Sequence, residues 1–185
     1  TTAHSHSRTF VVETMGRCTG HLALSGGLAA GADVILIPEV PYRVDEVVRI
    51  LKEQRDAGQR YAIVVVSEGS RETNGGEPSD RPAGGDLVKT LSRQLEKGVG
   101  GEVRSVVLSH LQRGGVPCSY DRRMARSFGI KAVDLICLEQ FGRMVVFKDG
   151  IFADRPFPED PSEVCEVDVD LRYDITRYRT RSSLL

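Results

Sequence analysis

The feature that most constrains the fold is a continuous apolar run at residues 62–66, within the segment RYAIVVVSEG. A strand buried on both faces has such a run, whereas a strand with one wet face alternates apolar and polar residues. Sheets that are buried on both faces are usually parallel and covered by helices. The run therefore predicts a strand inside a parallel sheet, and the polar residues that follow it predict a turn.

Segments with strand and helix patterns alternate along the rest of the chain. Strands are predicted at residues 9–16, 33–39, 60–69 and 102–111. Helices are predicted at residues 20–32, 44–58, 86–98 and 120–142. A strand pair with a turn at KDG is expected at residues 143–152, and the charged last 30 residues are expected to form a solvated tail or a final extended segment. Alternation of this kind favours an α/β fold with a mainly parallel sheet.

Composition excludes several classes of partner. The 185 residues carry a net charge of −1, so no overall field attracts nucleic acid or an anionic membrane. No apolar run approaches the length of a membrane span, and no secretion signal is visible. Cys18, Cys118, Cys137 and Cys165 lack zinc-ligand spacing and are expected to be reduced, partly buried thiols. We therefore expect a cytoplasmic protein with no metal site, no nucleic-acid partner and no membrane.

Polar residues follow the predicted strands at their carboxyl ends. Arg17, Glu68, His110 and Arg113 all occupy such positions. In open α/β sheets, ligands bind beyond the carboxyl ends of the strands. Guanidinium groups bind phosphate oxygens through paired hydrogen bonds, and a carboxylate accepts from sugar hydroxyls. One such residue alone is more often a surface charge, but their recurrence at successive strand ends suits a phosphorylated polyol.

Four segments, in order over about residues 4–150, resemble the 6-phosphofructokinase family: SRTFVVETMGRCTGHLAL, GADVILIPE, YAIVVVSEG and VRSVVLSHLQRGGVPCSYDRRMA. The M-G-R and H-x-Q-R-G-G motifs make this resemblance specific. It implies a three-layer α/β fold and transfer of phosphate to the 1-hydroxyl of fructose 6-phosphate, which gives fructose 1,6-bisphosphate in glycolysis. It also implies that residues 1–111 are part of the fructose 6-phosphate domain, that 112–158 return to the nucleotide domain, and that 159–185 form a C-terminal segment.

The resemblance also implies roles for individual residues. Arg17 would be catalytic, because it would stabilise charge on the transferring phosphoryl group. The residues that would bind the substrate beside it are Met15, Gly16, Glu68, His110 and Arg113. Of these, Met15 and Gly16 would line the sugar site, Glu68 would accept from sugar hydroxyls, and the last two would hold the sugar and its 6-phosphate.

Four further residues match family positions away from this group. Arg8 and Arg104 match arginines that reach the 6-phosphate from a neighbouring subunit, which implies a homo-oligomer, either a dimer or a tetramer. Gly31 and Asp33 match the magnesium position of the effector site. The nearby segment DAGQR offers one basic residue, so control by ADP or phosphoenolpyruvate is not expected.

Two family motifs do not occur in this sequence, namely P-x-T-I-D-N-D, which carries the catalytic aspartate, and G-G-D-G-S, which binds the nucleotide. We therefore expect the C-terminal part of a phosphofructokinase, in which Mg²⁺ with ATP, or pyrophosphate, is bound mainly by an N-terminal half. Because phosphoryl transfer depends on those parts, the chain by itself is expected to be nearly inactive. A pyrophosphate-dependent enzyme, a non-catalytic sugar-phosphate-binding subunit and an inert truncation remain as alternatives.

Overall fold

The computed structural model describes residues 2–79, 86–160, 162 and 164–181. The chain divides into two compact units. The first consists of Thr1–Arg113 with Val164–Leu185, and the second consists of Gly114–Glu163. Assignment of these parts to a sugar domain and a nucleotide domain stays a prediction.

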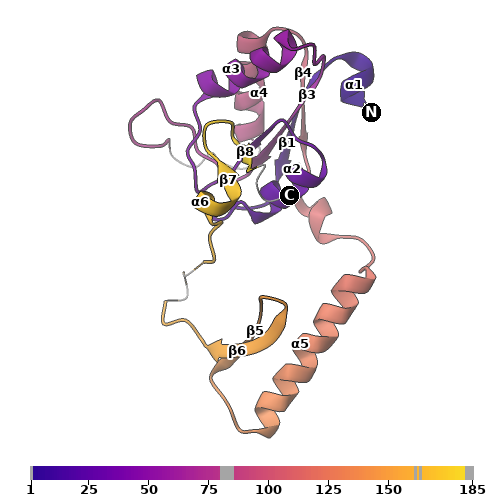
Figure 1. Cartoon of the computed structure of the whole chain (residues 1–185), viewed down its shortest axis with the longest axis vertical. Helices are drawn as coiled ribbons and strands as arrows, with labels where there is room; N and C mark the ends of the chain where they lie inside the picture. The colour runs from indigo at the N-terminus through magenta and orange to yellow at the C-terminus, as the bar shows by residue number, and fades with distance from the viewer. Residues whose placement is uncertain (1, 80–85, 161, 163, 182–185) are drawn as a thin grey trace. The chain divides into compact units, whose positions relative to one another are not determined.

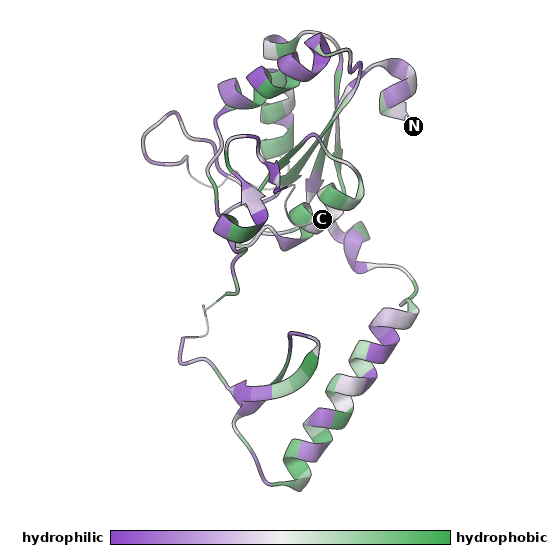
Figure 2. Cartoon of the chain, in the orientation of Figure 1, coloured by the Kyte–Doolittle hydropathy of each residue, from purple (hydrophilic) through white to green (hydrophobic). Residues whose placement is uncertain are grey.

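A parallel sheet forms the centre of the first unit (Figure 1). Its strands, in the order β2-β3-β1-β4, are β2 (Val34–Leu36), β3 (Ala62–Ser67), β1 (Thr9–Thr14) and β4 (Val103–Val107). The apolar run forms β3, which pairs on both sides, and Val64 and Val66 are fully buried. The predicted parallel sheet is therefore confirmed, and Figure 2 shows apolar residues concentrated along its strands.

Helices cover both faces of this sheet. They are α1 (Thr2–His6), α2 (His21–Ala29), α3 (Val44–Asp56) and α4 (Asp86–Val99). The step from β1 to β2 runs in one direction along the sheet, and the steps to β3 and β4 run in the other. Because such crossovers are right-handed, α2 lies on one face and α3 and α4 on the other, where they pack together (Figure 1). The expected three-layer α/β fold is confirmed.

The sequence of each large helix explains its boundaries and its buried face. In α3, the acidic residues Asp45 and Glu46 stand in the first turn and Arg55 stands in the last, which suits the helix dipole. In α4, one face consists of buried apolar residues at helical spacing, including Leu91 and Leu95, which are fully buried. The buried residues of α3, namely Val47, Ile50 and Leu51, belong to the same apolar core as those of α4.

The C-terminal segment packs onto the edge of the sheet as α6 (Val169–Arg172) followed by β7 (Tyr173–Asp174) and β8 (Arg179–Thr180), which pair as a hairpin. Tyr173 is fully buried and its hydroxyl donates to the carbonyl of Ile35 in β2. The Ile35 amide donates to the carbonyl of Tyr178 over 2.6 Å, and Tyr178 is also buried. Of the two alternatives for this segment, the solvated tail is wrong, because two tyrosines among the charges fix the segment to the core. The alternative of a final extended segment agrees with the β7–β8 hairpin.

The second unit contains α5 (Ser119–Cys137) and an antiparallel pair, β5 (Arg143–Lys148) and β6 (Ile151–Pro156), with η1 (Ser109–Arg113) ending just before the unit begins. The predicted long helix and strand pair are thus confirmed. Asp149 and Gly150 have φ angles of 53° and 81°, as the tight hairpin turn between β5 and β6 requires. Phe152 contacts both Phe128 of α5 and Phe147 of β5, and these rings join the helix to the hairpin.

The structure also shows how exposed the cysteines are and how apolar its helices are. All four cysteines are exposed, so the expectation that they are partly buried is wrong. Within the described ranges, no helix is long and apolar enough to cross a membrane.

Candidate functional site

The crevice where a ligand is expected lies between β1 and β3. These strands are neighbours, and the chain leaves them toward helices on opposite faces, α2 after β1 and α4 after β3. Such a reversal opens a crevice at the carboxyl ends of the two strands. Met15, Gly16 and Arg17 follow β1 and Glu68 follows β3, so the structure brings these predicted site residues to the same crevice.

Hydrogen bonds hold the two turns against each other. The Ser67 hydroxyl donates to the Gly16 carbonyl over 2.6 Å, and the Gly69 amide donates to the same oxygen over 3.1 Å. The Glu68 amide donates to the Thr14 carbonyl over 2.9 Å. The turn after β1 and the turn after β3 therefore form one connected structure, which fixes the backbone positions of Arg17 and Glu68.

Two glycines permit this close approach. Gly16 has a φ of +134°, and a Cβ added there would lie 2.3 Å from the Ser67 hydroxyl oxygen. A Cβ added at Gly69 would lie 1.9 Å from the carbonyl oxygen of Arg17, which is a backbone atom. Since both distances are below van der Waals contact, any larger residue forces the turns apart. The Arg17 side chain is exposed, whereas Met15 and Glu68 are half-buried.

His110 and Arg113 belong to η1, which follows β4 at the same edge of the sheet. The Leu108 amide donates to the Glu13 carbonyl over 3.0 Å, so η1 begins beside the end of β1. Ser109 has a φ of 44°, and its hydroxyl lies 3.1 Å from Nδ1 of His110. Both His110 and Arg113 are exposed. The carboxyl ends of the strands, called the carboxyl edge below, therefore carry Arg17, Glu68, His110 and Arg113. Two guanidinium groups, an imidazole and a carboxylate form a set that can bind a phosphorylated sugar.

Arg8 and Arg104 lie at the opposite end of the strands, the amino end. Arg8 precedes β1, Arg104 pairs in register with Phe10 near the start of that strand, and Glu102 forms an ion pair with each arginine. A strand rises about 3.3 Å per residue, so roughly 20 Å of β1 separates Arg8 from Met15. Within one chain, the structure therefore does not bring these two arginines to the carboxyl-edge residues.

Gly31 and Asp33 have structural roles in this chain. Gly31, with a φ of +65°, ends α2: its amide donates to Leu28 and the Ala32 amide donates to Gly27, which is a standard glycine helix terminus. The two carboxylate oxygens of Asp33 accept from Gln59 Nε2 over 2.7 Å and from the Ile63 amide over 2.8 Å.

Hydrogen bonds within the chain already hold the Asp33 carboxylate. Both Asp33 oxygens already accept hydrogen bonds, and Mg²⁺ requires oxygen ligands in near-octahedral order. Among the described residues, no group of three or more histidines, cysteines or carboxylates could hold a metal ion. The effector role inferred for Gly31 and Asp33 gains no support from these contacts and stays a prediction.

Glu13 is a residue that sequence reasoning missed. Its side chain is buried at the end of β1, and its Oε2 has no hydrogen-bond partner among the described residues. Burial, and then the nearby charge of Glu68, raise the pKa of Glu13, while a hydrogen bond from the Val88 backbone lowers it. The signal in the sequence was an acidic residue inside a strand whose other central residues are apolar. Glu13 thus links the first turn of α4 to the candidate site.

We predict that in Glu13→Gln the free energy of unfolding falls less with rising pH than in the parent protein. A carboxyl group whose pKa is raised in the folded state favours folding below its unfolded pKa of about 4.3, and that advantage is lost as pH rises through the folded pKa. The variant lacks this loss, so its stability relative to the parent should increase from pH 4 to pH 7. Urea denaturation at both values tests this, with the exposed Glu96→Gln as control. An equal change in both variants would contradict the assignment.

A parallel α/β sheet with glycine-dependent turns at its switch point is a fold that proteins of many functions share, and comparison with known proteins identifies the family. The family model for phosphofructokinase matches residues 1–136, and the chain belongs to that family.

Relatives and solved structures agree with this assignment. The chain is 42% identical over 158 residues to ATP-dependent 6-phosphofructokinase 3 of Streptomyces coelicolor, covering 80% of the chain and 46% of that protein. It is 43% identical over 152 residues to the ATP-dependent 6-phosphofructokinase of Thermosynechococcus vestitus, covering 80% and 41%. The chain thus spans less than half the length of these relatives.

The structural matches support the same fold. Phosphofructokinase from Saccharomyces cerevisiae matches with a TM-score of 0.72 at 31% identity, covering 84% of the chain and 20% of that chain. A pyrophosphate-dependent phosphofructokinase from Marinobacter aquaeolei matches with a TM-score of 0.79 at 22% identity, covering 97% and 47%. At that lower identity, the second match bears on the fold alone.

Proposed function

We propose that this chain supplies the sugar-phosphate side of an ATP-dependent 6-phosphofructokinase of glycolysis. The observation that supports the proposal is the pair of glycine-dependent turns after β1 and β3, in which the backbone of Arg17 lies against Gly69, the residue after Glu68. In this proposal, Glu68 accepts hydrogen bonds from sugar hydroxyls, and Arg17 stabilises negative charge near the 1-hydroxyl. His110 and Arg113 hold the end of the sugar that bears the 6-phosphate.

ATP is the favoured phosphate donor. The relatives that are 42% and 43% identical are named as ATP-dependent enzymes, whereas the pyrophosphate-dependent structure matches at 22% identity. Mg²⁺ with ATP would supply the transferring phosphoryl group, but the described residues offer no cluster of carboxylates to hold it. The residues of this chain are therefore assigned to binding and orienting the sugar, and low turnover is expected of the chain alone. Its cytoplasmic location also stays a prediction.

We further propose that two copies of the chain share each site. Arg8 and Arg104 lie at the amino edge of the sheet, about 20 Å along β1 from the other predicted ligands. A phosphate can contact both groups of residues only if one group comes from a second copy. A symmetric dimer would then hold two equivalent sites, each built from the carboxyl edge of one copy and the amino edge of the other.

Mixing two variants that each bind fructose 6-phosphate weakly tests this arrangement. The double variant Arg8→Ala/Arg104→Ala and the variant Arg113→Ala should each bind fructose 6-phosphate weakly, because every site in each homodimer has a defect. Random mixing after dissociation makes half of the dimers hybrids, each with one intact site, so about one quarter of the binding capacity should return. Equilibrium dialysis measures this capacity.

The controls separate sharing from function. Arg93→Ala, on the exposed face of α4, should leave binding unchanged by itself. If neither mutant protein loses binding, the assigned residues do not hold the sugar phosphate. If both variants lose binding and the mixture regains none, the substituted arginines bind the sugar phosphate without being shared between copies.

A further inference from the structure

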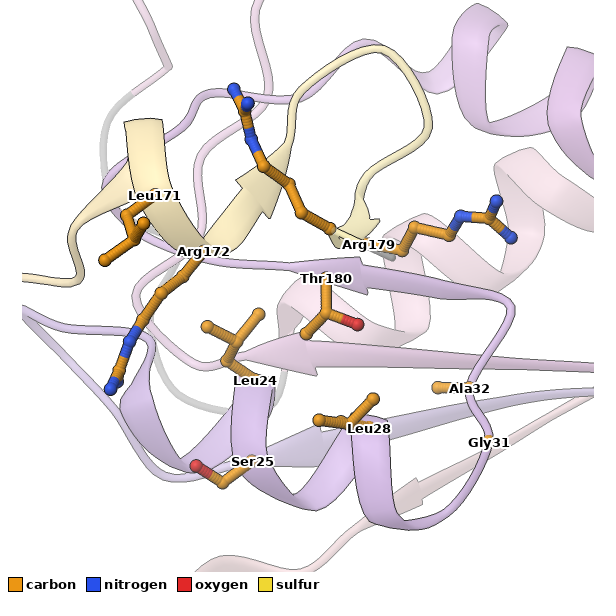
Figure 3. A pocket seen from close by; sticks show the side chains of 10 residues that line it. Leu24, Ser25, Leu28, Gly31, Ala32, Leu171, Arg172, Arg179 and Thr180 are labelled. Atoms are coloured by element: carbon orange, nitrogen blue, oxygen red, sulfur yellow. The ribbon is translucent and has the colours of Figure 1, made fainter. Parts of the chain in front are cut away.

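A cavity of about 500 Å³ lies in the first unit between α2 and the C-terminal hairpin (Figure 3). None of its lining residues belongs to the candidate sugar-phosphate site. Of the two residues matched to the effector position, Gly31 lines the cavity and Asp33 does not. Its volume lies in the range of about 300–1,000 Å³ that is common for small-molecule sites. The cavity therefore needs a separate physical explanation.

Its floor is apolar. Leu24 and Leu28 of α2 point toward Thr180 of β8, with Ala32 at one end of the floor (Figure 3). Leu28 is 50% exposed and Leu171, at the other end, is 55% exposed. Apolar side chains that face water inside a hollow gain stability when an apolar ligand covers them. The floor thus favours the hydrocarbon or aromatic part of a ligand.

One end of the cavity is positively charged. Arg172 extends along the side of Leu24 and Ser25, whereas Arg179 points away from the floor (Figure 3). Within the part of the chain that the structure describes, Arg172 forms no ion pair with a carboxylate. Two of the neighbouring carboxylates accept other hydrogen bonds, Asp168 from the Leu171 amide and Asp174 from Thr176. The guanidinium is therefore available to an anion.

The hairpin that forms this wall is firmly attached. The Arg181 amide donates to the Arg172 carbonyl over 3.1 Å, and Arg181 Nε donates to the Tyr173 carbonyl over 3.1 Å. Tyr173 itself is fully buried against β2. Because these contacts fix the backbone of the hairpin, a ligand would lose little affinity to ordering this wall.

We propose that this cavity binds a small amphiphilic anion, namely a carboxylate with a medium-length aliphatic or an aromatic body. The carboxylate pairs with the Arg172 guanidinium, which matches its geometry through two parallel hydrogen bonds. The apolar body lies on Leu24 and Leu28, and the hydroxyls of Ser25 and Thr180 stand at its sides. The inference is independent of fructose 6-phosphate binding, since no residue is shared.

Titration with octanoate tests the proposal. Amide chemical shifts followed by NMR should show saturable binding at one site, with changes at Leu28 and Thr180. Octan-1-ol, which lacks the charge, should bind at least tenfold more weakly than octanoate. Arg172→Gln should remove that preference for the anion, whereas Arg177→Gln, on the same hairpin but outside the cavity, should keep it. Leu28→Trp should fill the cavity and abolish binding of both compounds.

Several results would overturn the proposal. Equal affinity for octanoate and octan-1-ol in the parent protein would remove the role of Arg172. Shift changes that map outside the cavity, or no saturable binding by the folded parent, would remove the site. Octanoate affinity that falls as protein concentration rises would assign this face to contact between copies. If Arg172→Gln does not fold, the comparison of the two compounds on the parent and on Leu28→Trp still decides the question.

Discussion

Gly69→Ala is expected to lower the free energy of unfolding by about 3 kcal/mol or more, or to prevent folding. The added Cβ would lie 1.9 Å from the Arg17 carbonyl oxygen, and this oxygen cannot move unless the whole turn after β1 moves. Overpacking in a well-packed region typically costs about 1–3 kcal/mol, and a contact with a backbone atom belongs at the upper end. Urea denaturation followed by circular dichroism measures the loss.

Gly26→Ala is the matched control for this variant. Gly26 lies inside α2, and nothing stands within 4 Å of the position that its Cβ would occupy. Replacement of a glycine inside a helix by alanine typically stabilises by about 0.5–1 kcal/mol. If Gly69→Ala and Gly26→Ala unfold at the same urea concentration, the two turns do not pack as described, and the candidate site loses its foundation.

Tyr173→Ala is expected to lower the free energy of unfolding by about 3–5 kcal/mol, because it empties a fully buried aromatic site. Tyr173→Phe keeps the ring but removes the hydroxyl that donates to the Ile35 carbonyl, so it should cost about 1–2 kcal/mol. The same denaturation experiment separates the packing of the ring from the hydrogen bond.

The control for Tyr173 is an exposed residue of the same hairpin. Ile175 is 51% exposed, so Ile175→Ala should change stability by about 0.5 kcal/mol or less. If Tyr173→Ala has an equally small effect, the C-terminal segment would be a solvated tail after all, and the wall of the cavity beside α2 would not be fixed.

Much of the fold follows from patterns of apolar residues. The run that forms β3 has no polar interruption, so its burial on both faces could be predicted directly. The apolar face of α4 repeats at helical spacing, which indicates the helix without knowledge of its neighbours. The C-terminal hairpin could not be found in this way, because Tyr173 and Tyr178 are dispersed among arginines and gain their burial only from β2.

The candidate site was less accessible to sequence reasoning. The polarity of parallel strands brings Arg17, Glu68 and His110 to one edge, and this could be inferred from their places after the strands. The contact between Gly69 and Arg17 could not, since nothing in the sequence gives the distance between two turns. The hydrogen bonds that occupy Asp33 also depend on Gln59, a residue with no distinctive pattern around it.

The exposed thiols show the same limit. Cysteine is usually a buried residue, and composition alone therefore favoured burial. Whether a given cysteine is covered depends on how the surrounding elements pack, and in this fold all four stand at the surface.

The measurement that tests the proposed function most directly is a calorimetric titration of the purified chain with fructose 6-phosphate, repeated with Arg113→Ala and with the control Arg93→Ala. We predict binding in the micromolar-to-millimolar range for the parent and the control, and at least tenfold weaker binding for Arg113→Ala, since one charge-assisted contact contributes about 1.5–3 kcal/mol. The assignment of the carboxyl edge as a sugar-phosphate site would be contradicted if the folded parent gave no heat of binding, or if Arg113→Ala bound as tightly as the parent.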